Sequence, residues 1–145
     1  MNPGNTTHVP RSARVGVPTP ARLAAAVLAL AVAAIHILDQ GGFPGSKEPS
    51  YVGIGYYLLE LLELACLLVA AAFIWPATPS VLAVWLAAAF VAAGPLLGYI
   101  LSRGPGLPAY SDDRGNWTEP LGVISLVIET ALLVLSLAAV IVAPA

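Results

Sequence analysis

Four stretches of the chain are almost wholly apolar, and each is long enough to cross a lipid bilayer. They cover residues 21–38, 54–75, 80–102 and 120–143. A transmembrane helix needs about 20 mostly apolar residues, because the hydrocarbon core is about 30 Å thick and a helix rises about 1.5 Å per residue. The pattern predicts an all-α fold, an integral membrane four-helix antiparallel bundle.

Proline residues mark the ends of the predicted spans. Pro20 precedes the first span, Pro76 and Pro79 separate the second from the third, and Pro120 opens the fourth. Proline suits the first turn of a helix and stops a preceding one. Because so few residues separate the second and third spans, we expect a tight antiparallel hairpin there.

The third span also contains a pair of glycines at helical spacing. Gly94 and Gly98 form a GxxxG motif around Pro95. Such a motif lets another helix backbone approach closely. We expect it to pack against a neighbouring helix of the bundle, with a kink at Pro95 or a dimer face as the alternatives.

The segment before the first span differs in composition. Residues 1–20 are rich in Pro, Gly, Ser and Thr and are expected to form a disordered tail. Residues 21–145 then form a single membrane domain. An alternative follows from Ala31-Val32-Ala33, which resembles a signal-peptidase site, so that the first span could be a cleaved signal peptide.

Composition places the chain in lipid. Of its 145 residues 59% are apolar and only 10% are charged, and the mean hydropathy is +0.86. The net charge of −2 without a basic run argues against nucleic-acid binding. A single cysteine, Cys66, excludes an internal disulfide and a Cys-x-x-Cys metal or redox site. The lipid bilayer is the expected partner, and a membrane-protein partner or a homo-oligomer is left open.

The basic residues near the span ends predict the orientation. Arg11 and Arg14 precede the first span and Arg22 lies at its very start, whereas the two long loops combine Lys47, Arg103 and Arg114 with several acidic residues. Short loops rich in Lys and Arg stay in the cytoplasm. We therefore expect a multi-pass protein of the cell membrane with both termini cytoplasmic.

The ionisable residues of the spans gather in one layer, the half of the bundle near the two long loops. A span residue of this kind is a functional candidate, because burying it in lipid is costly. The candidate residues for binding a ligand or a proton are His36, Asp39, Glu60, Glu63, Tyr99, Arg103, Glu119 and Glu129.

These residue types favour a proton, a cation or a small polar ligand. Glu60 and Glu63 share a helix face, and two carboxylates cannot both stay ionised in low dielectric unless Arg103, His36 or a metal neutralises them. The alternative is a set of interhelical hydrogen bonds with no ligand. The Glu-x-x-His motif of di-iron bundles is missing, so no metal ligands are predicted and the cofactor is left unspecified. No catalytic motif is present, which favours a non-enzymatic role.

A run of about 30 residues carries a resemblance. Ser102-Arg103-Gly104-Pro105-Gly106-Leu107-Pro108 is followed by Asp113-Arg114-Gly115-Asn116-Trp117-Thr118-Glu119-Pro120-Leu121-Gly122. This pattern resembles one found in small uncharacterised membrane proteins of high-GC Gram-positive bacteria. The four spans and the run from Gly55 to Leu64 more weakly resemble DoxX-like membrane proteins, which implies a quinone- or metal-linked redox activity.

The same run predicts a rigid loop on physical grounds. Gly104, Pro105, Gly106 and Pro108 force a non-helical exit from the third span. Thr118 or Asn116 could cap the fourth span, and Glu119 suits its positive end. The loop could act as a lid over the polar layer or as a plain connector. A third functional class, an accessory subunit of a larger membrane complex, also fits this sequence.

Overall fold

The structure is a computed structural model that describes residues 19–42, 51–75, 81–108 and 111–142. Within these ranges it contains four helices and no strand. They are α1 (Thr19–Asp39), α2 (Tyr51–Ile74), α3 (Val81–Arg103) and α4 (Pro120–Val142). Each is long and apolar enough to cross a membrane, so the prediction of an all-α membrane bundle is confirmed. The predicted tail, apart from its last two residues, lies outside the described residues.

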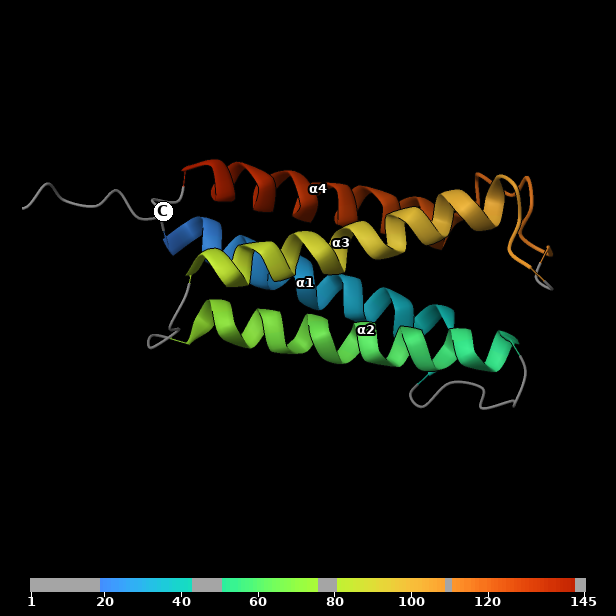
Figure 1. The fold of residues 1–145 in the computed structure, drawn as a ribbon, viewed down its shortest axis with the longest axis horizontal. Helices are drawn as coiled ribbons and strands as arrows, with labels where there is room; N and C mark the ends of the chain where they lie inside the picture. Colours follow the sequence, from blue (N-terminus) through green and yellow to red (C-terminus); the bar gives the residue numbers. More distant parts are fainter. Residues whose placement is uncertain (1–18, 43–50, 76–80, 109–110, 143–145) are drawn as a thin grey trace, which may run out of the picture.

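The helices run alternately up and down (Figure 1). The start of α1 and the end of α4 lie at one end of the bundle, here called the terminal end, and the end of α1 and the end of α3 lie at the other, the loop end. α1 and α3 each contact all three other helices, whereas α2 and α4 make no contact with each other in the described part of the chain. α1 therefore joins α2 to α4 on one side of the bundle, and α3 joins them on the other.

Small side chains explain why α1 can take this position. Its buried face carries Ala25, Ala26, Ala29, Val32 and Ala33, which recur at intervals of three and four residues. Small residues let helix backbones approach closely, and close approach is what stabilises helix pairs in lipid. The stripe continues toward the loop end through positions 36 and 40, where polar residues replace alanine.

The outer surface of the bundle is apolar. Phe90 is 79% exposed and Ile141 is 83% exposed. No more than 33% of any predicted span is buried inside the bundle, so most of each helix surface faces outward. Exposure of so large an apolar surface to water is unfavourable, so these helices are suited to contact with lipid.

The GxxxG motif of α3 does not pack as expected. A Cβ placed at Gly94 or Gly98 would have no atom within 4 Å, so these glycines face outward and do not form a contact inside the bundle. α3 continues through Pro95 to Arg103. Gly94 helps here, because the residue before proline clashes with the proline ring chiefly through its Cβ.

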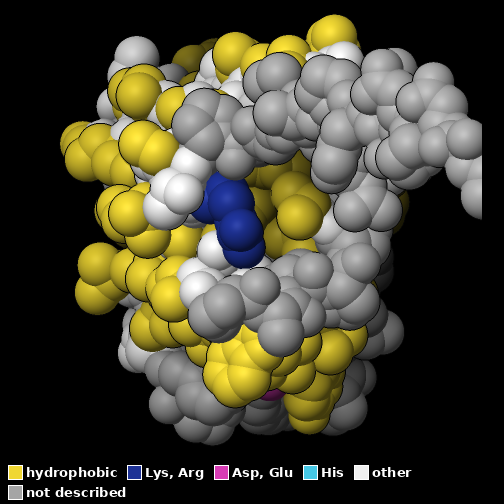
Figure 2. Space-filling view, turned by 90° about the vertical axis from the view of Figure 1, so that its left-hand side faces the viewer, with side chains coloured by type: hydrophobic (Ala, Val, Ile, Leu, Met, Phe, Trp, Pro, Cys, Tyr) yellow, Lys and Arg dark blue, Asp and Glu magenta, His cyan; other side chains and the backbone are white. Residues whose placement is uncertain are grey.

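The terminal end of the bundle holds one described basic residue. Figure 2 faces this end and shows a dark blue Lys or Arg side chain in a hollow with apolar walls. Arg22 lies in the first turn of α1 at this end, and its Nη2 donates to the main-chain oxygen of Trp75, just beyond α2, at 3.4 Å. The positive charge thus lies at the negative end of the α2 dipole.

Candidate functional site

Polar side chains form two groups at the loop end of the bundle. The deeper group, the carboxylate cluster, consists of His36, Gln40, Glu63, Ser125 and Glu129. The group above it, the loop clasp, consists of Tyr99, Ser102, Arg103, Asp113, Trp117 and Glu119. Together they draw on all four helices.

The carboxylate cluster centres on a contact between α1 and α4. His36 Nε2 lies 3.0 Å from Glu129 Oε1, and the side chains are 13% and 1% exposed. The Ser125 hydroxyl donates to the same carboxylate oxygen at 2.5 Å, from one turn earlier on α4. Glu129 therefore has one hydrogen-bond partner on its own helix, α4, and one on α1.

A second carboxylate of the cluster is held from α2. Gln40 Nε2 donates to Glu63 Oε1 at 2.5 Å, and Glu63 is 1% exposed. Glu63 and Glu129 both lie within electrostatic range of the buried Cys66 side chain. The two carboxylates thus belong to one buried region although α2 and α4 are not in contact.

The geometry of α1 explains how it reaches both. His36 and Gln40 are four residues apart and so lie on the same face of the helix, which is the face that packs against α2 and α4. Gly41 has a φ of 80°, which lets the Gly42 N–H bond back to the Ile37 oxygen at 2.8 Å and ends the helix. The chain therefore turns away just after its last contact with the cluster.

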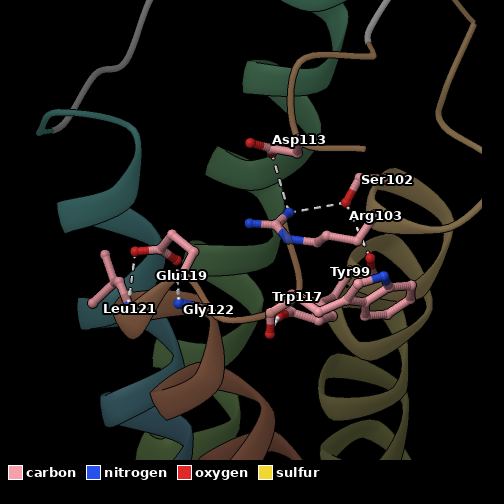
Figure 3. Close-up of polar contacts among 8 residues, drawn as sticks. All are labelled: Tyr99, Ser102, Arg103, Asp113, Trp117, Glu119, Leu121 and Gly122. Carbon is pink, nitrogen blue, oxygen red and sulfur yellow. Dashed lines mark hydrogen bonds and ion pairs between the residues drawn. The ribbon is translucent and has the colours of Figure 1, made fainter. Parts of the chain in front are cut away.

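The loop clasp centres on Arg103, the last residue of α3. Its Nη1 donates to Ser102 Oγ at 2.9 Å and to Asp113 Oδ2 at 3.2 Å (Figure 3). Its main-chain oxygen accepts from the Gly115 N–H at 2.8 Å. Arg103 thus fastens the loop between α3 and α4 through both its side chain and its backbone.

Two aromatic residues close the clasp beneath the arginine. The Tyr99 hydroxyl donates to the main-chain oxygen of Trp117 at 2.8 Å, and the two rings meet edge to face with centroids 6.0 Å apart. The Arg103 guanidinium carbon lies 4.3 Å from the centre of the Tyr99 ring. A cation over an aromatic ring is favourable, more so when partly shielded from water.

The start of α4 is capped by Glu119. Its Oε1 accepts from the Leu121 N–H at 2.9 Å and its Oε2 from the Gly122 N–H at 2.5 Å. The expectation that Thr118 or Asn116 would provide the cap is wrong, because the longer Glu119 side chain folds back over its own helix. A Cβ at Gly122 would lie 2.6 Å from Tyr99 Cε2, so only glycine allows Tyr99 this close to α4.

The other predicted site residues lie at the edge of these groups. Asp39 is exposed at the end of α1, within electrostatic range of His36, Arg103, Asp113 and Glu119. Glu60 is partly buried one turn before Glu63. The structure thus places His36, Glu63 and Glu129 in the carboxylate cluster, and Tyr99, Arg103 and Glu119 in the loop clasp. Arg103 pairs with Asp113.

Sequence reasoning missed Gln40 and Ser125 as hydrogen-bond donors to the buried carboxylates. Both could have been found from spacing, since Gln40 follows His36 by four residues and Ser125 precedes Glu129 by four. Several residues of the 102–122 pattern hold the loop in place through contacts of the clasp.

The donor set of the cluster suits hydrogen bonding better than metal binding. Among the described residues no group of three or more His, Cys, Asp or Glu side chains is arranged to hold a metal ion. The contacts of 2.5 to 3.0 Å between cluster side chains are direct hydrogen bonds. What this arrangement can do is hold and exchange a proton.

Comparisons with protein-family models, with curated proteins and with solved structures give no match for this chain. The function therefore has to be argued from the site.

Proposed function

We propose that this small multi-pass membrane protein binds an exchangeable proton on the His36–Glu129 pair, reached from the loop end of the bundle. The observation that carries the proposal is the 3.0 Å contact between an imidazole and a carboxylate inside apolar helices, with Glu129 only 1% exposed. The activity is that of a proton-linked binding or transport module.

Charge arithmetic supports a proton on this pair. A neutral imidazole beside an ionised carboxylate has a net charge of −1. One added proton makes the pair neutral, either as imidazolium with carboxylate or as imidazole with carboxylic acid. Without that proton a net negative charge remains in a low-dielectric region, which is costly. The number of bound protons is therefore tied to the local environment, as a proton-linked protein requires.

Size favours a proton over a larger ligand. Glu129 Oε1 already accepts from Ser125 and contacts His36, and Glu63 Oε1 already accepts from Gln40. A ligand of several atoms would have to break these contacts. A proton can move along them without changing the positions of heavy atoms.

The position of His36 supports access from the loop end. Its side chain is 13% exposed, whereas Glu129 is 1% exposed, so the imidazole is the member of the pair nearer to solvent. Asp39, one turn further out, lies within electrostatic range of it. A proton would enter through the imidazole and reach the carboxylate second.

The decisive experiment is an NMR titration of the histidine ring. The chain has two histidines, and His8→Gln leaves His36 as the single reporter. In nanodiscs, the signals of the His36 ring nitrogens and of the Glu129 carboxyl carbon should respond together when the proposed proton is removed, because it would lie between Nε2 and Oε1. Glu129→Gln should abolish this shared response.

Asp112→Asn is the matched control, since Asp112 is an exposed carboxylate of the loop. It should leave the His36 signals unchanged. A His36 titration that is the same with and without Glu129 would refute the proposal.

The proposed orientation has its own test. We propose that the loop end faces outward, because all charged residues of the segment before α1 are basic. In a Cys66→Ser background, Ser111→Cys places a thiol at an exposed position of the loop. A membrane-impermeant maleimide should label it in intact cells. Labelling only after lysis would reverse the orientation and move proton access to the cytoplasm.

The resemblance to DoxX-like proteins leaves a redox activity as a prediction. A quinone- or metal-linked protein would be purified with a chromophore or with stoichiometric metal. An absorption spectrum and elemental analysis of the purified wild type decide this, with the Glu63→Gln, Glu129→Gln double variant as the comparison.

A further inference from the structure

Two polar side chains lie fully buried in the half of the bundle away from the candidate site. Trp85 on α3 and Ser136 on α4 are each 0% exposed. Neither the Trp85 indole N–H nor the Ser136 hydroxyl has a hydrogen-bond partner among the described residues. The sequence predicts an almost purely apolar interior at this depth, so these two groups need an explanation.

The fold brings the two groups to the same depth. Trp85 lies four residues after the start of α3, and Ser136 lies six residues before the end of α4, at the same end of the bundle. At about 1.5 Å per residue, the two positions differ by only about 3 Å along the axis. Leu132 and Ala139, one turn to either side of Ser136, belong to the same buried cluster as Trp85.

We propose that the Trp85 indole N–H and the Ser136 hydroxyl bind one water molecule between α3 and α4. The indole is a donor only, and the hydroxyl can donate and accept. A water molecule between them can accept from the indole and hydrogen-bond with the hydroxyl, which satisfies both groups at once. Buried waters in proteins typically occupy such places, where polar groups would otherwise have no partner.

Conformational freedom of the serine offers a competing explanation. A helical serine can rotate its hydroxyl to the main-chain oxygen four residues earlier, here that of Leu132. That would satisfy Ser136 without water, but it would leave the Trp85 indole N–H unpaired. The two explanations therefore differ in what happens at the indole when Ser136 is changed.

The test follows the indole N–H by NMR. Protein labelled with ¹⁵N-tryptophan in nanodiscs gives three indole signals, because the chain has three tryptophans, and Trp85→Phe identifies the signal of Trp85. A bound water should give a nuclear Overhauser peak at this indole proton, distinguished from proton exchange by a rotating-frame measurement. Ser136→Ala should remove the peak, whereas Ser136→Thr, which keeps the hydroxyl, should retain it.

The signal of Trp117 reports whether each variant is folded. Trp117 lies in the loop clasp at the other end of the bundle, so its signal should stay in place. No water peak at the Trp85 indole of the wild type would overturn the proposal. A peak that is unchanged in folded Ser136→Ala would do the same.

Stability gives a second readout that does not depend on detecting water. If the water is shared, Ser136→Ala leaves the indole N–H unsatisfied and should lower the folded-to-unfolded ratio by on the order of tenfold. The loss should be smaller in a Trp85→Phe background, because the indole donor is then already gone. Equal losses in the two backgrounds would contradict a shared water.

Discussion

The close approach of Tyr99 to the start of α4 makes Gly122 a sensitive position. A Cβ at Gly122 would lie 2.6 Å from Tyr99 Cε2 and 2.9 Å from Glu119 Oε2. Ordinary contact between carbon atoms is about 3.5–4.0 Å, so the ring would have to move by about 1 Å. We therefore expect Gly122→Ala to disturb the loop clasp and the helix cap together.

The size of the effect can be worked from the contacts that move. Displacing Tyr99 weakens its hydrogen bond to Trp117, which is worth about 1 kcal/mol, and its contact with the Arg103 guanidinium, worth roughly 0.5–2 kcal/mol. Alanine regains up to about 1 kcal/mol from its better helix propensity. The net expectation is a loss of about 0.5–2 kcal/mol in the free energy of unfolding.

Gly98→Ala provides a matched control on the neighbouring helix. A Cβ there would meet no atom within 4 Å, so only the propensity gain remains. The two variants make the same chemical change, and their effects on stability should differ in sign. The measurement is reversible unfolding in mixed micelles, followed by circular dichroism. Gly122→Ala as stable as Gly98→Ala would refute the close packing of Tyr99 against α4.

Three further predictions concern the cap of α4, the buried Cys66 thiol and the His36–Glu129 pair. Glu119→Ala should destabilise the protein by about 1 kcal/mol, the usual cost of losing an N-cap, in the same unfolding assay. Cys66 is 0% exposed and should react with maleimide only after denaturation, and fast labelling of the native protein would contradict its burial. Glu129→Leu alone should cost about 1–3 kcal/mol in that assay, because the His36 ring and the Ser125 hydroxyl lose their shared partner, whereas His36→Leu with Glu129→Leu should be nearly neutral or stabilising.

The helices could be predicted because their signal is local. Each apolar run is interrupted by proline or by a polar segment, and α4 begins at Pro120 as the sequence predicts. The direction in which a glycine pair faces is not local. Gly94 and Gly98 look like a packing motif, but the packing of α3 is decided by the larger buried face of Trp85, Val91 and Tyr99.

Only the depth of the candidate site residues along the helices could be predicted from the sequence. Helical rise places ionisable residues at similar depth, and the structure does bring His36 and Glu129 into contact. Which side chains pair depends on the rotation of each helix about its axis, which one sequence does not reveal. Spacing places Gln40 beside His36 on α1, but it does not reveal that Gln40 faces Glu63 on α2.

The two polar groups at the loop end are suited to different tasks. The loop clasp lies where the chain leaves the apolar region, and its members hold the loop by an ion pair, an aromatic contact and a helix cap. Each of these is a common way to stabilise a surface connection. The carboxylate cluster lies deeper, where a buried ion pair contributes little to stability compared with apolar packing. A requirement for stability alone would be met by leucine at positions 36 and 129, which supports the proposal that the polar pair binds a proton.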